Sequence, residues 1–400
     1  MAKQYRLLLL GAMPTHVPLI QRAKERGIYV ITTDYIPENI GHKYSDEAYY
    51  VSTTDKDAVL ELAKKCKVDG VMTFCSDPAA STAAYVSEML NLPSSGYEAV
   101  SIMTHKELFR SFLHENGFNC PHFQFYDNIE SAKLCINEFS FPFMVKPVDS
   151  SGSKGVAKVS DICELKPALA EAFRYSRSNR IIIEDVIEPK GPQIHGSAFV
   201  QDGKVVFCQL GDHHFDPEIN NLLPISTTWP STCSENELQF VKEELQRFVS
   251  AIGYKQGGID LETRINIKDN KLYLIEVGPR NGGDYIPTVM QYYSGVNLSD
   301  ACINAALGLP IQLMESGGKK YYCYYVIHSK IDGMLEEVRL SEMLRNHVVE
   351  KHDYISIGEK VYRGTSSQNT IGILVLGFDS HNEMLSLISN CGEHCRVIIA

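Results

Sequence analysis

The fold and the chemistry of this chain are both indicated by one stretch, Phe143-Met144-Val145-Lys146-Pro147-Val148-Asp149-Ser150-Ser151-Gly152-Ser153-Lys154-Gly155. An apolar run, which predicts a strand, ends at Lys146, and a loop of small residues with a second lysine follows directly. Small residues let several backbone N–H groups converge on one anion, and the Lys146 ammonium group would lie at the same place. The stretch predicts a phosphate-binding loop, with a hairpin turn carrying solvated lysines as the alternative. Its spacing is not G-x-x-x-x-G-K-[ST], so a Walker P-loop is excluded.

The length and composition are those of a globular protein with several domains. A chain of 400 residues exceeds one hydrophobic core and suggests two or three domains. Its longest apolar runs, such as Leu7–Leu10, are too short to span a bilayer, and its first residues lack a signal-peptide pattern. The net charge of −11 argues against general nucleic-acid binding. We therefore expect neither a membrane nor a nucleic acid as partner.

The cysteines favour a reducing compartment. There are 11 of them, an odd number scattered along a long chain, which is typical of free thiols in the cytoplasm. Cys391 and Cys395 lie close together with His394 between them, but no second pair accompanies them, so we do not expect zinc there. The sequence predicts a cytoplasmic protein.

The first hundred residues alternate between strand and helix patterns. We expect strands over 6–10, 29–33 and 70–74 and helices over 14–26 and 56–66. This order predicts a parallel sheet covered by helices, in which ligands bind at the carboxyl ends of the strands, here Gly11, Asp34 and Cys75-Ser76-Asp77. The first turn, Gly11-Ala12-Met13-Pro14-Thr15-His16, is not G-x-G-x-x-G, so a dinucleotide is not expected, although Asp34 stands where a ribose-binding acid would.

Capping boxes and a turn signal predict where several helices and strands of the middle of the chain begin or end. Capping-box spacings at Thr104–Glu107 and Ser234–Glu237 each predict the start of a helix, and Asp202-Gly203 predicts a hairpin turn. Between them, residues 211–233 read as a polar loop containing His213, His214 and Trp229. Those histidines would either bind a substrate carboxylate or be solvated loop residues.

Two further strands carry acids. Gly257–Asn266 and Lys271–Val277 surround a turn at Asp269-Asn270, and Asp260 and Glu262 share one face of the first strand. Glu276 ends the second strand, where a solvated strand end is the alternative to a functional role. Two carboxylates facing each other across a hairpin suit Mg²⁺. Arg280 follows in Gly278–Asp284 and would lie beside that site.

Taken together, the chain resembles the ATP-grasp superfamily of carboxylate–amine ligases. It is most similar to amino-acid and dipeptide ligases, and less so to biotin carboxylase, the purine carboxylases and carbamoyl-phosphate synthase large-chain domains. The resemblance implies an α/β and α+β fold: a Rossmann-like domain over residues 1–100, a two-lobed ATP-grasp domain over 101–317, and a small C-terminal α+β domain over 318–400. Short strands and a helix near Asn382–Ser389 fit that last domain.

The resemblance also assigns roles to residues. Lys106, within His105-Lys106-Glu107-Leu108-Phe109-Arg110, and Lys146 match the two ATP-phosphate lysines, and Arg280 matches the arginine of the E-x-N-P-R motif. Glu262 and Glu276 match the two metal carboxylates. The flap over the β- and γ-phosphates matches the run Ser151, Gly152, Ser153, Lys154 and Gly155. The adenine hinge matches the run Glu184, Asp185, Val186 and Ile187.

Two positions depart from the family pattern. Gly278 stands where the family has an asparagine after the second metal acid, so one metal or phosphate ligand is missing or replaced. Gln193 stands at the expected ribose acid; it would still bond a hydroxyl group, and Glu188 is a substitute candidate. Both departures concern single contacts and leave the implied fold unchanged.

The chemistry implied by the resemblance is ATP-dependent ligation. ATP would phosphorylate a carboxylate, and an amine would displace the acyl phosphate to give an amide with release of ADP and phosphate. Mg²⁺, or Mn²⁺ in its place, together with Lys106, Lys146 and Arg280 would offset the charge of the transferring group, and the flap would exclude water. Lys146 and Arg280 are therefore the expected catalytic residues.

Three functions remain open at this stage. The small terminal domain and the polar loop with Trp229 favour an amino-acid ligase. A carboxylase of the biotin or purine type would use bicarbonate as its acid. A non-catalytic ATP-binding regulator would not need to keep Glu262, Glu276 and Arg280. The expected partners are a small-molecule carboxylate and an amine, with a homodimer as one form of the assembly.

Overall fold

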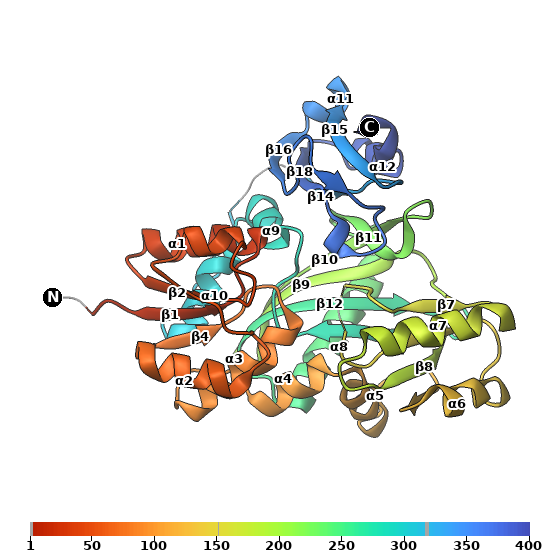
Figure 1. The fold of residues 1–400 in the computed structure, drawn as a ribbon, viewed down its shortest axis with the longest axis horizontal. Coiled ribbons are helices and arrows are strands. Elements are labelled where there is room, and N and C mark those ends of the chain that lie inside the picture. Colours follow the sequence, from red (N-terminus) through yellow and green to blue (C-terminus); the bar gives the residue numbers. More distant parts are fainter. Residues whose placement is uncertain (1–2, 151, 317–319) are drawn as a thin grey trace.

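The N-terminal part forms a parallel α/β layer, as the alternating pattern predicts. The structure is a computed structural model that describes residues 3–150, 152–316 and 320–400. Helices cover both faces of the sheet in this layer (Figure 1). Leu7 and Leu9 therefore pack into a hydrophobic core on one face, and Leu8 and Leu10 pack into a core on the other. The sheet order is β3-β2-β1-β4, from β1 (Arg6–Leu10), β2 (Tyr29–Thr33), β3 (Glu47–Tyr49) and β4 (Gly70–Met72), with α1 (Val17–Glu25), α2 (Lys56–Cys66), α3 (Asp77–Met89) and α4 (Tyr97–Thr104).

A small lobe follows and contains the loop that the sequence singled out. Its four antiparallel strands lie in the order β5-β8-β6-β7, and α7 (Ile162–Tyr175) packs on β6 and β7. The predicted phosphate loop connects these two strands. The other elements of the lobe are β5 (Phe123–Tyr126), β6 (Phe143–Pro147), β7 (Ala157–Val159), β8 (Ile181–Asp185) and α6 (Ile129–Ala132). Helix α5 (Lys106–Glu115) precedes them, and its Phe109 and Leu113 pack into a core shared with α4.

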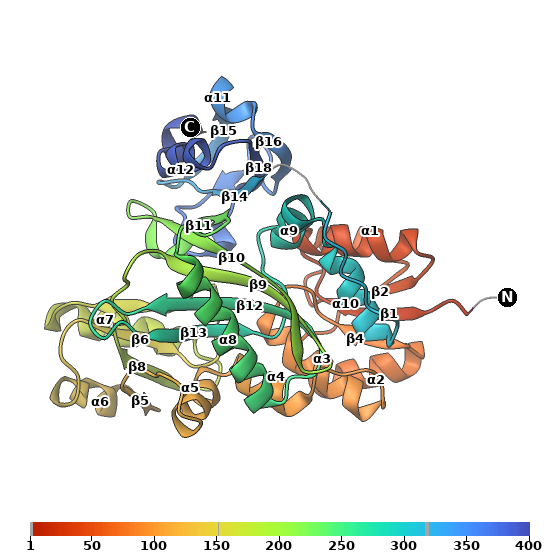
Figure 2. The same cartoon turned by 180° about the vertical axis from the view of Figure 1, so that it is seen from behind.

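An eight-stranded sheet forms the centre of the molecule. Helix α8 (Glu235–Ile252) crosses its back (Figure 2) and packs against Ile194, Ala198 and Val200 of β9. Residues alternate between the faces of a strand, so the polar residues Gln193, His195 and Ser197 lie on the opposite face. The order is β13-β12-β9-β10-β11-β14-β18-β16, from β9 (Gln193–Gln201), β10 (Lys204–Asp216), β11 (Asn220–Trp229), β12 (Gly257–Ile265), β13 (Leu272–Gly278), β14 (Tyr321–Ile327), β16 (Val348–Asp353) and β18 (Gly372–Phe378).

The C-terminal part continues this sheet. β14 pairs antiparallel with β11, with Ser226 opposite Tyr325, so the predicted boundary near residue 318 divides a single sheet. A second, three-stranded sheet has the order β17-β15-β19. The elements beyond the large sheet are β15 (Gly333–Leu340), β17 (Lys360–Val361), β19 (Cys395–Ile399), α11 (Glu342–Arg345), α12 (His381–Ser389) and α13 (Cys391–His394).

Two helices tie the centre of the molecule back to its N-terminal part. After β13, the chain forms α9 (Ile286–Ser294) and α10 (Leu298–Leu307), and α10 packs against α1 and β4. Arg22 Nη2 and Arg26 Nη1 of the N-terminal part lie 2.8 and 2.9 Å from the Asp300 carboxylate of α10. Leu9, Val289 and Tyr324 belong to one shared hydrophobic core, so the three expected parts are packed together.

Two local predictions are wrong. Residues 211–233 are not a polar loop, because β10 and β11 extend through most of this range as a long hairpin. Thr104 does not cap a helix: it is the last residue of α4, its hydroxyl bonds back to the Val100 carbonyl, and α5 begins at Lys106. The other capping box, at Ser234, and the turn at Asp202-Gly203 are confirmed.

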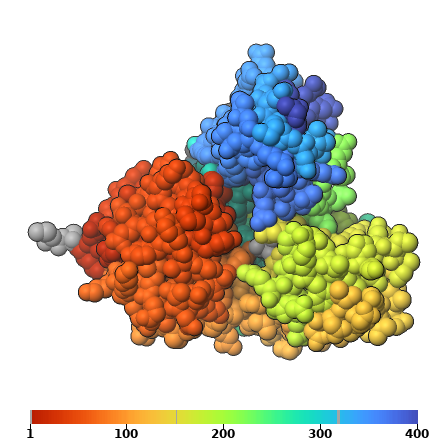
Figure 3. Space-filling view, in the orientation of Figure 1, coloured from red at the N-terminus to blue at the C-terminus, as the bar shows by residue number. Residues whose placement is uncertain are grey.

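The surface, the helices, the thiols and the metal-ligating side chains add four further observations. A depression lies where the N-terminal part, the small lobe and the C-terminal part meet (Figure 3). Within the described ranges, no helix combines the length and the apolar character needed to cross a membrane. Cys391 and Cys395 are buried free thiols, and the described residues contain no group of three or more side chains arranged to hold a metal ion.

Candidate active site

The two predicted metal acids face each other. Glu262 of β12 lies directly opposite Glu276 of β13 in the antiparallel pairing, so both carboxylates project from the same face of the large sheet. Burial and, after it, the charges of the neighbouring Glu276 and Asp260 carboxylates together raise the pKa of Glu262 to about 7. A divalent cation would relieve this repulsion. Mg²⁺ is commonly held by one or two carboxylates plus substrate phosphates, so this pair fits Mg²⁺ without a third protein acid.

Glu262 is held in place by neighbouring polar side chains. Gln193 donates from Nε2 to Glu262 Oε2 over 2.8 Å and accepts a bond from Arg264 Nε, also at 2.8 Å. His213 Nε2 lies 3.9 Å from Glu262. Gln193 is thus engaged at the metal acids, and a contact with a ribose hydroxyl group stays a prediction. The substitute, Glu188, pairs instead with Lys268 at 2.9 Å.

The two predicted phosphate lysines lie on the small-lobe side of these acids. Lys106 Nζ donates to the Ser150 carbonyl at 3.0 Å and lies 3.8 Å from Glu276. Its backbone N–H bonds to the Val148 carbonyl at 2.9 Å, so the start of α5 is fixed against the strand end that carries Lys146. Both ammonium groups therefore border the same region.

Lys146 belongs to a buried cluster with Glu184 and Arg110. Lys146 bonds to the Glu184 carboxylate, and Arg110 Nε donates to the same carboxylate at 2.8 Å. Burial lowers the pKa of Lys146, and although burial opposes ionisation of Glu184, the charges of Arg110 and Lys146 hold its pKa well below the usual range. Glu184 therefore has a side-chain role that the adenine-hinge assignment does not describe.

The rest of the predicted adenine hinge leaves β8. Asp185 is the last residue of the strand, and its N–H bonds to the His122 carbonyl. Val186 and Ile187 follow, and neither forms a backbone hydrogen bond with another described residue. Free N–H and C=O groups at these positions suit the hydrogen-bonding edge of a purine, so the geometry is compatible with that assignment.

The predicted flap has the backbone that its small residues suggest. Gly152, Ser153 and Gly155 all have positive φ, at 64°, 57° and 72°, while Ser151 lies outside the described residues. Ser153 Oγ donates to the Leu222 carbonyl at 2.7 Å. A Cβ atom added to Gly152 would lie 2.5 Å from Ser367 Oγ, so the flap touches both the β10–β11 hairpin and the C-terminal part. Burial lowers the pKa of Lys154, and the nearby Arg177 charge lowers it further.

Arg280 lies beside the metal acids, as predicted, but two carboxylates hold it. Its Nε and Nη2 donate to Asp77 at 2.8 and 2.7 Å, and Nη1 bonds to Asp260 and to the Asn281 carbonyl. These contacts use four of the five guanidinium N–H groups, so one N–H of Nη2 is left for the phosphoryl contact that the sequence predicts. Asp77 was noted only as part of a strand end, and its pairing with Arg280 was not predicted.

This pairing also explains the departure at position 278. A Cβ atom added to Gly278 would lie 3.0 Å from Asp77 Oδ1 and 3.4 Å from the guanidinium group of Arg280. Any larger residue would therefore press on the ion pair between the N-terminal part and the large sheet.

The histidines lie on strands and not in a loop. His213 is buried on β10, with Nδ1 at 2.6 Å from Thr227 Oγ1, and His214 Nε2 lies 2.9 Å from Thr228 Oγ1. Neither is a solvated loop residue. His195 on β9 was not singled out in the sequence, yet its ring lies 4.8 Å from that of His213 and 5.5 Å from Trp229. The alternation of Gln193, His195 and Ser197 along one strand was the signal available for it.

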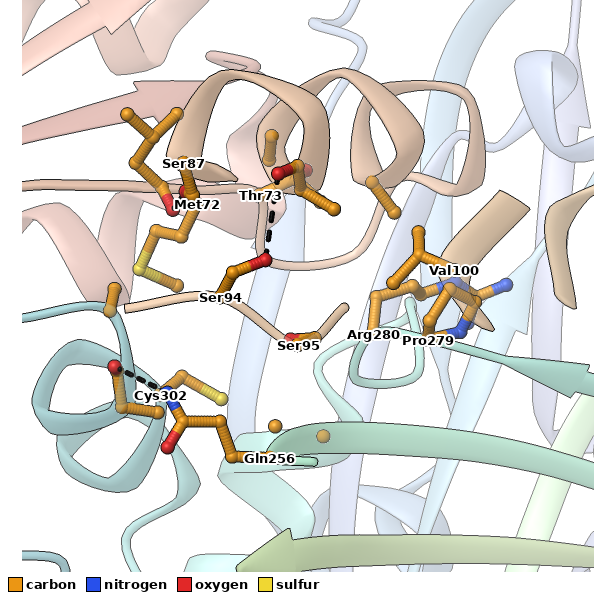
Figure 4. A pocket seen from close by; sticks show the side chains of 18 of the residues that line it. Met72, Thr73, Ser87, Ser94, Ser95, Val100, Gln256, Pro279, Arg280 and Cys302 are labelled. Atoms are coloured by element: carbon orange, nitrogen blue, oxygen red, sulfur yellow. Dashed lines mark hydrogen bonds between the residues drawn. The ribbon is translucent and has the colours of Figure 1, made fainter. Parts of the chain in front are cut away.

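A separate pocket lies behind Arg280, between the N-terminal part and the start of β12 (Figure 4). Ser94, Ser95, Gln256 and Cys302 are among the residues that line it, and Arg280 and Pro279 form one end. Glu262 and Glu276 do not line this pocket. The metal acids therefore face the other side of the Arg280 cluster.

Comparisons with known proteins agree with this architecture. Residues 139–289 match the family model described as ATP-grasp domain. The large chain of carbamoyl phosphate synthase from Thermotoga sp. (strain RQ2) is 26% identical over 298 residues, which cover 69% of this chain and 26% of that protein. The chain thus spans about a quarter of the length of the curated relatives it matches.

Solved structures match over the whole chain. The L-amino acid ligase from Bacillus licheniformis has a TM-score of 0.80 at 22% identity, with full coverage of both chains. The biotin carboxylase domain of 2-oxoglutarate carboxylase from Hydrogenobacter thermophilus, a dimer in complex with MgADP, ADP and bicarbonate, has a TM-score of 0.74 at 16% identity, covering 100% of this chain and 92% of that one. At these identities the likeness establishes the fold. Residues 139–289 thus match the ATP-grasp domain model, and the chain as a whole shares its fold with these solved structures.

Proposed function

We propose that the protein is an ATP-dependent ligase that joins a carboxylate to an amine and releases ADP and phosphate. The observation that carries this proposal is the Glu262–Glu276 pair, directly opposite across two strands, with Lys106 3.8 Å from one of the acids. Facing acids beside a lysine and a flap suit a nucleotide triphosphate bound with metal. The related fold that was crystallised with MgADP supports the same choice of nucleotide and ion.

Each group of site residues would have its own role in the reaction. Lys106 and Lys146 would bind phosphate oxygens, and the N–H groups of the flap would cover them. Val186 and Ile187 would bond the adenine edge. Mg²⁺ held by Glu262 and Glu276 would neutralise charge on the transferring phosphoryl group.

These residues would support a reaction in two steps. A substrate carboxylate oxygen attacks the γ-phosphorus of ATP, the bond to the β–γ bridging oxygen breaks, and ADP leaves. The amine then attacks the acyl carbon, loses a proton, and expels phosphate. No nucleophilic side chain of the protein is required. We further propose a small-molecule acid and amine as partners, a homodimeric assembly, and a reducing cytoplasm as the setting for the free thiols.

The test is ADP release with hydroxylamine in place of the amine. Amino acids, simple carboxylic acids and bicarbonate are each added with ATP and Mg²⁺, because hydroxylamine intercepts an acyl phosphate as a hydroxamate. The proposal expects a hydroxamate, ADP and phosphate with an organic acid. ADP release with bicarbonate alone would favour a carboxylase, and AMP and pyrophosphate would show adenylate chemistry. No nucleotide consumption with any acid tried would leave the ATP-binding regulator as the alternative.

A further inference from the structure

Asp284 is an acid at the edge of the Arg280 cluster. It lies in the loop between β13 and α9, and both Asp284 and Tyr285 have left-handed backbones, with φ of 50° and 60°. Non-glycine residues rarely adopt this conformation, and it is concentrated at functional sites. Among the described residues, the Asp284 carboxylate forms no hydrogen bond and no ion pair, and its side chain is half-buried. A strained backbone thus presents a free carboxylate.

The surroundings of Asp284 come from three parts of the chain. Its charge is among the causes that raise the pKa values of Cys75 after β4, Tyr324 of β14 and Tyr354 after β16. The neighbouring Tyr285 stacks on His352 of the C-terminal part, with 3.6 Å between ring centroids, and its hydroxyl donates to the Pro14 carbonyl of the N-terminal part at 3.4 Å. A Cβ atom added to Gly282 would lie 2.9 Å from Asp260 Oδ1 of the large sheet, so the loop that carries Asp284 lies where these three parts meet. The cation within its electrostatic reach is Arg280, and that guanidinium is already shared by Asp77 and Asp260.

A second, independent observation points to a ligand at the same place. His195 is 1% exposed, and neither of its ring nitrogens has a hydrogen-bond partner among the described residues. Its Nε2 points at Asp260 Oδ1 across 3.6 Å, and that oxygen also lacks a partner. Buried polar atoms are nearly always hydrogen-bonded, so two unpartnered groups facing each other mark a position that a bound group completes.

The charge of the region decides what kind of group this is. Asp77, Asp260 and Asp284 surround one guanidinium, so the cluster has an excess of negative charge. Burial, followed by the repulsion of Asp260, raises the pKa of Asp284 to about 6, as expected for an acid without a cation. An alkylammonium group supplies the missing charge and three N–H donors, which match the free acceptors at Asp284, Asp260 and His195.

We propose that Asp284, together with Asp260 and His195, binds the ammonium group of an amino-acid substrate and selects amino acids over plain carboxylic acids. The reaction that follows rests on the proposed ligase function, whereas the binding step does not. The ammonium group belongs either to the acid that is phosphorylated or to the amine that attacks it. In both cases Asp284 determines the substrate class.

The experiment is a binding titration of the whole chain, saturated with Mg²⁺ and the non-hydrolysable ATP analogue AMPPNP. The 20 standard amino acids, the matching carboxylic acids without an amino group, and ethylammonium chloride are titrated by calorimetry. We expect at least one amino acid to bind about tenfold or more tightly than its amino-free counterpart. Asp284→Asn should weaken that amino acid by about tenfold and leave the amino-free acid and AMPPNP unchanged.

Two variants complete the design. Asp284→Glu keeps the charge and should recover part of the affinity, and Asp379→Asn, at an exposed acid of the C-terminal part, should bind like the parent. Binding of ethylammonium that depends on Asp284 assigns the subsite to the attacking amine, and its absence assigns it to the phosphorylated acid. Equal affinity of the parent for amino and amino-free acids, or unchanged affinity in Asp284→Asn, would overturn the proposal. Asp284-dependent binding without ADP release would retain the subsite and remove the ligase function.

Discussion

Two buried ion clusters flank the metal acids, and they have opposite composition. In the cationic cluster, Arg110 and Lys146 surround the single carboxylate of Glu184. In the anionic cluster, Asp77 and Asp260 surround the single guanidinium of Arg280. The cationic cluster therefore has one positive charge in excess, and the anionic cluster has one negative charge in excess.

The difference indicates which ligand group each side is prepared to receive. Excess positive charge lies next to the flap and Lys106, where a triphosphate would bind. Excess negative charge lies next to Asp284, where we place an ammonium group. Buried ions without a counter-charge are unfavourable, so each cluster is most stable when its ligand is present. In this proposal, ATP and the ammonium group would bind on opposite sides of the Glu262–Glu276 pair.

Removing the central ion of the anionic cluster should have the largest effect on stability. Arg280→Leu leaves Asp77 and Asp260 without their shared cation and removes a link between the N-terminal part and the large sheet. We expect a loss of about 3–5 kcal/mol in the free energy of unfolding, measured with urea. Arg339→Leu, at an exposed pair with Glu337, serves as the control and should unfold like the parent. A loss below about 1 kcal/mol for Arg280→Leu would show that the cluster is not a structural unit.

Removing a cation from the other cluster should mainly affect the nucleotide. Lys146→Ala leaves Glu184 paired with Arg110, so the fold should persist, but ATP affinity should fall by about 1.5–3 kcal/mol, or about 10–100-fold. Calorimetric titration with AMPPNP measures this change. Lys158→Ala, on the exposed side of β7, is the matched control. Unchanged affinity in Lys146→Ala would remove this lysine from the phosphate site.

The metal acids should respond to pH. The pKa of Glu262 is raised to about 7 from 4.5, so the metal-free protein loses stability as pH rises from about 4.5 to 7. Glu262→Gln removes this penalty and should be more stable than the parent above pH 7, by about 1–2 kcal/mol, and equal to it near pH 4. Thermal melts across this pH range, without Mg²⁺, test the prediction. A parent that is the more stable protein at pH 8 would contradict it.

The smallest effect is expected where the anionic cluster meets Gly278. Gly278→Ala places a Cβ atom 3.0 Å from Asp77 Oδ1, which forces the ion pair to shift slightly. We expect a loss of about 1 kcal/mol in the free energy of unfolding, with ATP affinity unchanged. Gly283→Ala, where an added Cβ would meet nothing within 4 Å, provides the comparison. Equal stability of the two variants would show that a Cβ atom at position 278 does not disturb the Asp77–Arg280 ion pair.

The sequence predicted the cationic side better than the anionic side. Lys106, Lys146 and the flap follow one another in recognisable local patterns, and the strand pairing of Glu262 and Glu276 follows from one hairpin turn. By contrast, Asp77 and Arg280 are separated by 203 residues, and no local pattern joins them. The same holds for Arg110 and Glu184, which meet only when α5 packs against β8.

The wrong prediction for residues 211–233 had a local cause, and the missed β11–β14 pairing had a long-range one. The polar composition of residues 211–233 indicated a loop, but these residues lie on the polar face of a sheet strand pair, where His213 and Thr227 bond to each other. The β11–β14 pairing could not be foreseen, because it joins segments on either side of about a hundred residues of other structure. This long-range pairing joins the C-terminal part to the large sheet.

Transfer of an isotope label from substrate to phosphate tests the central claim most directly. The acid that supports ADP release is labelled with ¹⁸O in its carboxylate and incubated with ATP, Mg²⁺ and amine, with Glu276→Gln as the inactive control. Because the carboxylate oxygen attacks the γ-phosphorus and stays there when the amine expels phosphate, one ¹⁸O atom should appear in the released phosphate. Phosphate without the label, or the label in AMP, would contradict ligation through an acyl phosphate.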